Sequence, residues 1–331
     1  MMPGVIGFCL IGVMLSVYAL LDGYDLGAGA ISLVLAKTRR ERSAIVESIG
    51  PFWSGNEVWL VAAGGTLFAL FPKVYAVAFS GFYLPFIVVL WLLMFRGIAI
   101  ELREQLPGDV WMDFWDTAFS ISSLLLILLF GVTIGNLVRG LSLDRDAYFL
   151  GTFSTLLNPY ALLVGVLAVL ALVQHGLAYV AANVEGPLAE RALRYIGRLW
   201  WLVIVAFIAV TAMTIAAHHV DFALASLAVA AGVIALGALV AVRYVAGHGR
   251  TRATFRASVA YVAAMLVSAG ATMYPYLIRP LPGSTQGLSV LQTSPPALAI
   301  SSVIAVVGLI AVVSYSVFIR HRMPSKTAAT E

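Results

Sequence analysis

Nine runs of about 20 mostly apolar residues dominate the chain, and a helix of that length crosses the hydrocarbon layer of a bilayer. Charged residues make up 11% of the chain, against about 25% in a typical soluble protein, so a soluble core could not absorb this apolar surface. The runs also lack the polar alternation of membrane β-strands. We therefore predict an all-α integral membrane protein with about nine transmembrane helices. The expected spans are residues 4–36, 51–71, 77–97, 117–135, 159–182, 199–217, 222–242, 257–277 and 296–318.

The first apolar run is longer than a single crossing needs. It contains Gly23, Gly27 and Gly29. Glycines in a membrane helix permit either a close approach of a neighbouring helix or an interruption of the helix. We therefore expect a tilt or a break within this span.

The basic residues predict the orientation of the chain. With the N-terminus outside, 16 of the 20 Lys and Arg residues fall in the inner segments or at an inner helix end, and Lys73, Arg139, Arg145 and Arg279 remain outside. Because basic residues concentrate on the cytoplasmic side, we expect an outer N-terminus and a cytoplasmic C-terminus. The net charge of +4 lies in clusters that flank apolar runs, which indicates membrane topology and not nucleic-acid binding. The inner segments are 37–50, 98–116, 183–198, 243–256 and 319–331.

Two acids, Asp22 and Asp25, lie inside the first apolar run in the stretch DGYDLGAG (22–29). They are three residues apart, so one face of a helix carries both. An ionised group near the bilayer centre costs about 2.5–3.5 kcal/mol on insertion scales, so such residues usually face other helices and serve a function. A proton relay or ion-handling site and a polar clamp between helices are the two interpretations.

A third acid, Glu57, lies in GPFWSGNEVW (50–59), where Pro51 suits the first turn of a helix. A span that starts there places Glu57 about 9 Å into the membrane. Asn56 beside it adds hydrogen-bond donors and an acceptor. Proton transfer and a buried, hydrogen-bonded carboxyl are again the alternatives.

Arg96 and Glu101 stand at the end of the third span, in RGIAIELR (96–103). Apolar residues continue between them, so we expect both to be partly buried and to pair with other groups. The alternative is an interfacial charge pair whose long side chains extend to the membrane surface.

The histidines argue against a haem held by this chain. A b-type haem in a helix bundle commonly needs histidine ligands, and of five histidines only His175 lies within a predicted span. Metal-binding spacings, a phosphate loop and a nucleophile elbow are also missing from the sequence. We expect no metal site, no catalytic residue and no cofactor bound by this chain's own side chains.

Six stretches resemble subunit II of the cytochrome bd-type quinol oxidases, which use ubiquinol or menaquinol. The first four are the more specific, and with the length and the nine spans the resemblance covers essentially the whole chain. The stretches are DGYDLGAG (22–29), GPFWSGNEVWLVAAGGTLFALFP (50–72), YAVAFSGFYLP (75–85), RGIAIELR (96–103), LLNPYALL (156–163) and MYPYLIRP (273–280).

The resemblance implies a heterodimer in the prokaryotic plasma membrane. Subunit I would carry two b-type haems, one d-type haem and the quinol-oxidation site, and this chain would stabilise it and contribute routes for protons and dioxygen. The complex would couple quinol oxidation to reduction of dioxygen to water in the aerobic respiratory chain, and so generate a proton gradient. The implied fold is a single transmembrane domain over 1–331, with four-helix bundles at about 1–135 and 159–277 and a peripheral helix at about 296–318.

Ser54 departs from the family pattern. Many members carry an acid at this position, and a serine does not titrate at physiological pH. Ser54 and Trp59 stay candidates for the lining of a dioxygen or proton route. The family is also described with a bound structural quinone in this subunit, but no residue here identifies such a site, and the presence of a small accessory subunit stays open. The positions that match the family pattern are Asp22, Asp25, Asn56, Glu57 and Trp59.

Two other functions stay open from the sequence. A secondary transporter or another proton-conducting membrane protein would also have buried acids, interrupted helices and many spans, with a substrate site at the membrane midplane. A purely structural partner would use the buried acids only to clamp its helices together.

Overall fold

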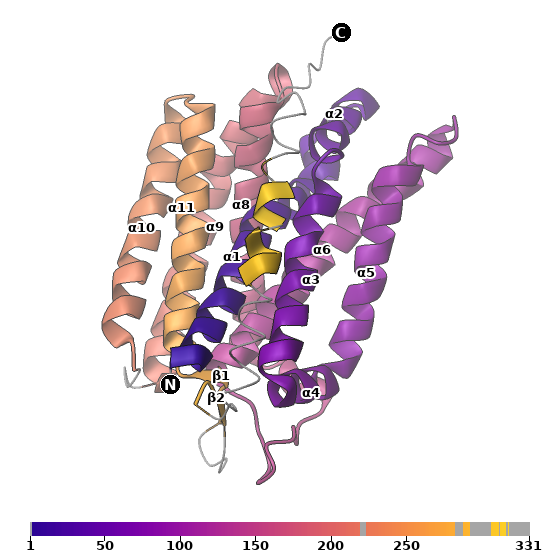
Figure 1. Ribbon diagram of the computed structural model, residues 1–331. Helices are drawn as coiled ribbons and strands as arrows, with labels where there is room; N and C mark the ends of the chain where they lie inside the picture. Colours follow the sequence, from indigo (N-terminus) through magenta and orange to yellow (C-terminus); the bar gives the residue numbers. More distant parts are fainter. Residues whose placement is uncertain are drawn as a thin grey trace.

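The computed structural model describes residues 2–218, 223–281, 287–291, 306–310, 312–315 and 317. Long helices stand side by side in one bundle (Figure 1). The first half contains α1 (Met2–Leu35), α2 (Arg39–Ile49), α3 (Trp53–Leu70), α4 (Pro72–Gly81), α5 (Tyr83–Leu102) and α6 (Asp109–Arg139). The second half contains α7 (Phe153–Leu156), α8 (Pro159–Asn183), α9 (Pro187–His218), α10 (Ala225–Gly247), α11 (Thr251–Met273) and the antiparallel strands β1 (Tyr276–Ile278) and β2 (Leu288–Ser289).

Seven helices in the described part of the chain are long and apolar enough to cross a membrane: α1, α5, α6, α8, α9, α10 and α11. The predicted class of helical membrane protein is confirmed, whereas the count of nine spans is not. α3 occupies the second predicted span, but its 18 residues include the polar pair Asn56 and Glu57. Most of the predicted span 296–318 lies outside the described residues, and its segments 306–310 and 312–315 are helical.

The span predicted at 77–97 is displaced along the chain. Pro72–Gly81 forms a separate short helix, α4, and α5 begins only at Tyr83. Phe82 separates the two with φ −102° and ψ 25°, which lie outside the α-helical values. Pro72 is in the first turn of α4, where the missing N–H of proline removes no hydrogen bond.

The glycines of α1 produce close packing and not a break, so of the expected tilt or break the break is wrong. α1 is a continuous helix of 34 residues. A Cβ atom built on Gly27 would lie 1.8 Å from the carbonyl oxygen of Leu172 in α8. One built on Gly176 of α8 would lie 2.2 Å from the amide nitrogen of Ala28. Small residues on both helices therefore bring the two backbones together without interrupting either one.

α1 lies at the centre of the bundle and packs against α3, α6 and α8. α6 packs against both α5 and α8, so it joins the two halves of the chain. α1 begins at the end of the bundle that carries α4 and the small sheet, and α2 lies at the opposite end (Figure 1). We call the latter the α2 end. The division into two four-helix bundles stays a prediction.

Candidate functional site

Arg96 of α5 lies at the centre of a buried cluster of acids from α1 and α3. Its Nη2 and Nη1 atoms donate to the two carboxylate oxygens of Asp22, at 2.5 and 2.9 Å. Nη1 also donates to Oε1 of Glu57 at 3.0 Å, and Nη2 lies 3.8 Å from Oδ2 of Asp25. One guanidinium therefore connects three helices through three carboxyl groups.

Asn56 holds the second acid in place. Its Nδ2 donates to Oδ2 of Asp25 at 2.8 Å, and it lies 3.2 Å from the hydroxyl of Tyr24 and 3.4 Å from the carbonyl oxygen of Leu21. The local sequence explains the geometry, because Asp22 and Asp25 are three residues apart on α1 and share one face. Tyr24 was not predicted as a site residue, although its position in DGYDLGAG was a signal for it.

Three of the four charged side chains in the cluster are fully buried, and the fourth is partly exposed. The side chains of Asp22, Asp25 and Arg96 are 0% exposed, whereas that of Glu57 is 25% exposed. Asp25 precedes the end of α1 by ten residues, and Glu57 follows the start of α3 by four. At 1.5 Å per residue, Glu57 lies roughly 6 Å and Asp25 roughly 15 Å from the α2 end of the bundle.

The charges in the cluster do not balance if every acid is ionised. Three carboxyl groups share the guanidinium of Arg96, which can compensate one of them. Uncompensated charge in a low-dielectric interior is costly, so these carboxyl groups depend on the hydrogen bonds that they share with Arg96. The cluster therefore gathers three groups of a kind that can exchange protons, and Glu57 is the member that faces the surface of the bundle.

The remaining predicted site residues lie apart from Arg96. Glu101 is exposed, so its expected burial is wrong: it lies within two residues of the end of α5, where its side chain reaches outside the bundle. Ser54 is exposed in the first turn of α3. Trp59 is buried against Met14, Tyr18 and Ala63, on a different face of α3 from Glu57.

His175 is fully buried in α8, and both of its ring nitrogens are engaged. Nδ1 lies 2.7 Å from the hydroxyl of Ser258, and Nε2 lies 3.0 Å from the carbonyl oxygen of Leu20. Its ring stacks on Phe255 at 5.3 Å between centroids. The described residues contain no group of three or more His, Cys, Asp or Glu side chains arranged to hold a metal ion. His175 therefore packs the helices together and offers no free nitrogen to a haem iron.

A second network of charged side chains joins the helices at the α2 end of the bundle. Arg103 at the end of α5 is buried and donates from Nε to Asp116 of α6 at 2.6 Å. Arg42 of α2 contacts Asp116 at 3.3 Å and Asp113 at 3.1 Å, and Arg39 contacts Asp113 at 2.9 Å. Asp116 and its partner Arg103 are 13 residues apart, across the turn between the two helices. This network ties α2, α5 and α6 together, and we interpret it as structural.

An ion pair between Glu41 of α2 and Arg191 of α9 connects α9 to the same end of the bundle. Nη1 and Nη2 of Arg191 donate to the two carboxylate oxygens of Glu41 at 2.8 and 3.0 Å, and Nη1 also donates to the carbonyl oxygen of Leu35 at 2.7 Å. Arg191 thereby satisfies a terminal carbonyl of α1. Its hydrogen bond holds the pKa of the Glu41 carboxyl below the ordinary value of 4.5.

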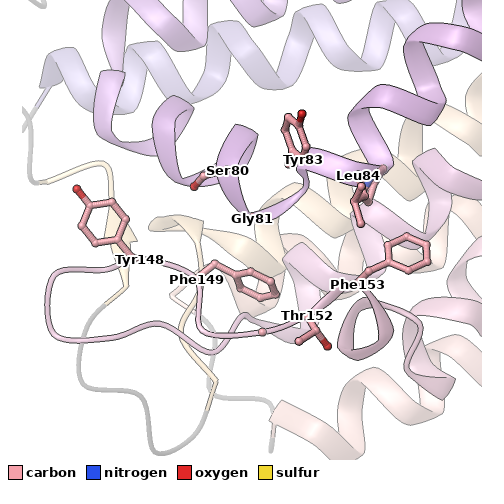
Figure 2. A pocket seen from close by; sticks show the side chains of 10 residues that line it. Ser80, Gly81, Tyr83, Leu84, Tyr148, Phe149, Thr152 and Phe153 are labelled. Carbon is pink, nitrogen blue, oxygen red and sulfur yellow. The ribbon is translucent and has the colours of Figure 1, made fainter.

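A surface hollow of about 440 Å³ lies far from the acid cluster, at the end where α4 meets α5. Tyr83 and Leu84 of α5 line one side, and the segment with Phe149 and Phe153 lines the other (Figure 2). Its lining contains aromatic rings and hydroxyl groups but no Asp, Glu, His, Lys or Arg. The hollow therefore offers no groups for proton handling near neutral pH.

The fold and the site define a multi-span helical membrane protein whose buried acids surround one arginine and whose His175 is committed to hydrogen bonds. A family model described as cytochrome bd terminal oxidase subunit II matches residues 2–322. The chain belongs to this family, so the predicted resemblance is confirmed and a secondary transporter is not favoured.

Two curated relatives and one solved structure agree with this assignment. The chain is 40% identical to cytochrome bd-I ubiquinol oxidase subunit 2 of Escherichia coli (strain K12) over 190 residues, which are 56% of this chain and 50% of that protein. It is 36% identical to cytochrome bd ubiquinol oxidase subunit 2 of Bacillus subtilis (strain 168) over 207 residues, 62% of this chain and 61% of that protein. The matched region therefore spans about half the length of the first relative. The fold resembles a chain of the bd oxidase from Geobacillus thermodenitrificans with a TM-score of 0.78 and 20% identity, covering 97% of this chain and 98% of that one.

Proposed function

We propose that this chain is the second subunit of a quinol oxidase complex that reduces dioxygen to water in a prokaryotic plasma membrane. In this proposal a partner subunit binds two b-type haems and one d-type haem and oxidises the quinol. The present chain stabilises that partner and supplies part of a proton route. The family match supports the complex, and the acid cluster around Arg96 is the observation that carries the proton role.

The proposed proton route uses Glu57 as its entry. Glu57 is the partly exposed member of the cluster, and its carboxyl is hydrogen-bonded to the guanidinium that also binds Asp22. A proton taken up at Glu57 can reach Asp22 by rearrangement of hydrogen bonds around Arg96, since a carboxyl both donates and accepts once it is protonated. Ser54 is exposed and lies outside this cluster, so the route does not depend on an acid there.

The proposed orientation places the cluster toward the cytoplasm. The α2 end of the bundle carries Arg39, Arg42, Arg103 and Arg191, as expected for a cytoplasmic surface. Because α1 begins at the other end, the N-terminus would lie outside. Protons would then enter from the cytoplasmic side, which is the direction that generates a gradient when dioxygen is reduced.

The proposed partner interface is the face formed by α3 and α5. Glu57 is partly exposed there, and a carboxyl that faces lipid would be costly. Large apolar side chains are exposed on both helices: Val61 and Phe68 on α3 and Trp91 and Met94 on α5 are all more than half exposed. A partner subunit that covers this face would remove Glu57 from lipid and bury the aromatic ring of Trp91, as expected at a tight interface.

Substitution of Glu57 tests the proton role. Glu57→Gln keeps the size and hydrogen-bonding capacity of the side chain but cannot carry a proton. We expect oxygen consumption per haem to fall by about 100-fold, with the amount of assembled complex unchanged. Ser54→Ala, one turn away on the same helix, is the matched control and should leave both quantities unchanged. Normal turnover per haem with a reduced yield of complex would show instead that the cluster only clamps the helices.

Site-specific crosslinking tests the partner interface. A photo-crosslinking amino acid at position 61 on α3 should capture the partner subunit in membranes. The same amino acid at position 233 on α10, where Val233 is 65% exposed, should capture none. Capture from position 233 but not from position 61 would show that the partner binds the α10 side of the bundle, and would contradict the proposed interface on α3 and α5.

A further inference from the structure

Six exposed arginines gather at the α2 end of the bundle on the side formed by α9, α10 and α11. Their helices are neighbours, because α10 packs against both α9 and α11. The guanidinium carbon of Arg243 lies 3.9 Å from a Cβ atom built on Gly197, which places this α10 side chain against the start of α9. We call these residues the arginine patch: Arg194, Arg198, Arg243, Arg250, Arg252 and Arg256.

In the part of the chain that the structure describes, the arginine patch has fewer acidic partners than the other half of the same surface. Arg39, Arg42, Arg103 and Arg191 each lie within 4 Å of at least one carboxylate. Within the described residues, the acid found that close to the patch is Glu190, at 3.8 Å from Arg194, and that pair is exposed. The patch therefore presents a strong excess of positive charge.

A hollow of about 350 Å³ opens within this patch, at the turn between α10 and α11. Arg250 and Arg252 both line it, together with Thr251 and the small residues Ala182, Gly249 and Ala253. Small side chains leave space beside two guanidinium groups, and guanidinium groups bind phosphate through paired hydrogen bonds. The hollow thus combines room for a phosphate group with the donors that recognise one.

Exposed apolar side chains lie next to the patch, on the part of the helices that enters the membrane. Tyr244 is 66% exposed beside Arg243 on α10, and Trp201 and Leu202 are 63% and 57% exposed beyond Arg198 on α9. Aromatic residues at this depth mark the boundary between headgroups and acyl chains. A ligand with a phosphate head and apolar chains matches both parts of the surface.

We propose that the arginine patch binds the headgroup of an anionic phospholipid, with the phosphate beside Arg250 and Arg252. Basic sites at the ends of membrane helices are suited to such lipids, because arginines attract the phosphate while neighbouring apolar side chains contact the acyl chains. The site is separate from the acid cluster, so it does not depend on the proton role proposed above. It would anchor α9, α10 and α11 to one membrane surface.

Lipid retention measured by native mass spectrometry tests the proposal. The detergent-purified complex that contains this chain is titrated with dioleoyl phosphatidylglycerol or with the zwitterionic dioleoyl phosphatidylcholine. We expect selective retention of phosphatidylglycerol, reduced about fivefold for each arginine removed in the double variant Arg250→Gln, Arg252→Gln. The charge-preserving variant Arg250→Lys, Arg252→Lys should retain most of the binding.

The matched control removes two exposed basic residues from elsewhere on the chain. Lys73→Gln combined with Arg145→Gln makes the same change in net charge and should leave phosphatidylglycerol binding unchanged. Equal loss in both glutamine variants, or equal retention of the two lipids by the unmodified complex, would overturn the proposal. Complete displacement of the lipid by millimolar inorganic phosphate would also overturn it, since the site would then recognise a free anion.

Discussion

Arg96 and Glu57 are joined by a 3.0 Å hydrogen bond between α5 and α3, and the same guanidinium binds both carboxylate oxygens of Asp22 on α1. Arg96 is fully buried, so its charge is stabilised by these partners and not by water. Removing one member of a buried charge network is costly, because the oppositely charged groups that remain are left buried without an ion-pair partner. The same contacts that position the candidate proton carriers therefore also hold three helices together.

Replacing Arg96 should destabilise the protein strongly. Arg96→Met keeps much of the side-chain volume but leaves Asp22 without its guanidinium, so we expect a loss of about 3–5 kcal/mol in the free energy of unfolding. Thermal melting of the purified complex, followed by size-exclusion chromatography, measures the effect. Adding Asp22→Asn should restore part of the loss, because it removes the uncompensated charge. Arg145→Met, an exposed control, should melt like the unmodified protein, and an equal melting temperature for Arg96→Met would contradict this account.

The close contact between α1 and α8 predicts that Gly27 cannot be replaced. In Gly27→Ala the new methyl group would overlap the carbonyl oxygen of Leu172, which belongs to the backbone and cannot rotate away. We expect a loss of at least about 1–3 kcal/mol, because the helices must separate and repack. Gly12→Ala on the same helix has no atom within 4 Å of the new methyl and should be neutral or slightly stabilising. Equal thermal stability of the two variants would argue against close packing as the role of Gly27.

Local patterns in the sequence were sufficient to predict the helices of this fold. Apolar runs of bilayer length correspond to α1, α5, α6, α8, α9, α10 and α11, since hydrophobicity and length are local properties. The division between α4 and α5 was missed, because residues 74–95 contain no charged residue and only the backbone angles of Phe82 separate the helices. Of the tilt or break expected in α1, the break was wrong, because Gly23 and Gly27 pack against α8 and Gly29 packs against α6, neighbours that the sequence of α1 does not reveal.

The members of the site were easier to predict than their pairing. Asp22, Asp25, Glu57 and Arg96 stood out as charges within apolar runs, and all four meet in the structure. Arg96 and Asp22 are 74 residues apart, however, and the interpretation of Arg96 as an interfacial residue was equally open. Glu101 had the same local signal as Arg96, but α5 ends one residue after it, and so it is exposed. The distinction depends on where a helix ends and what packs against it.

The stability of the folded protein should depend on pH through the ionisation of the Glu41 carboxyl group. Arg191 lowers the pKa of this carboxyl in the folded protein below its ordinary value of 4.5. The ion pair therefore stabilises the fold fully above about pH 4.5, and the contribution is lost as the pH falls through the lowered pKa. We expect the difference in melting temperature between the unmodified protein and Glu41→Gln to be largest near neutral pH and to shrink on acidification below about pH 4.5. Glu47→Gln, an exposed position on the same helix, should show little difference at either pH, and a difference for Glu41→Gln that does not vary with pH would contradict the pairing.

His175 should contribute to stability and not to haem binding. The carbonyl oxygen of Leu20 can only accept a hydrogen bond, so Nε2 of His175 donates to it. Nδ1 lies 2.7 Å from the hydroxyl of Ser258, which also lies 2.8 Å from the carbonyl oxygen of Phe255. Neither nitrogen is left for iron. His175→Phe should therefore keep the haem absorbance per assembled complex, while the loss of two buried hydrogen bonds lowers the free energy of unfolding by about 1–3 kcal/mol. Ser258→Ala, which removes only one of these bonds, should cause a smaller loss with the same haem content. A stoichiometric loss of haem in His175→Phe complexes that remain assembled would show that this side chain is an iron ligand, and would remove the reason to assign every haem to the partner subunit.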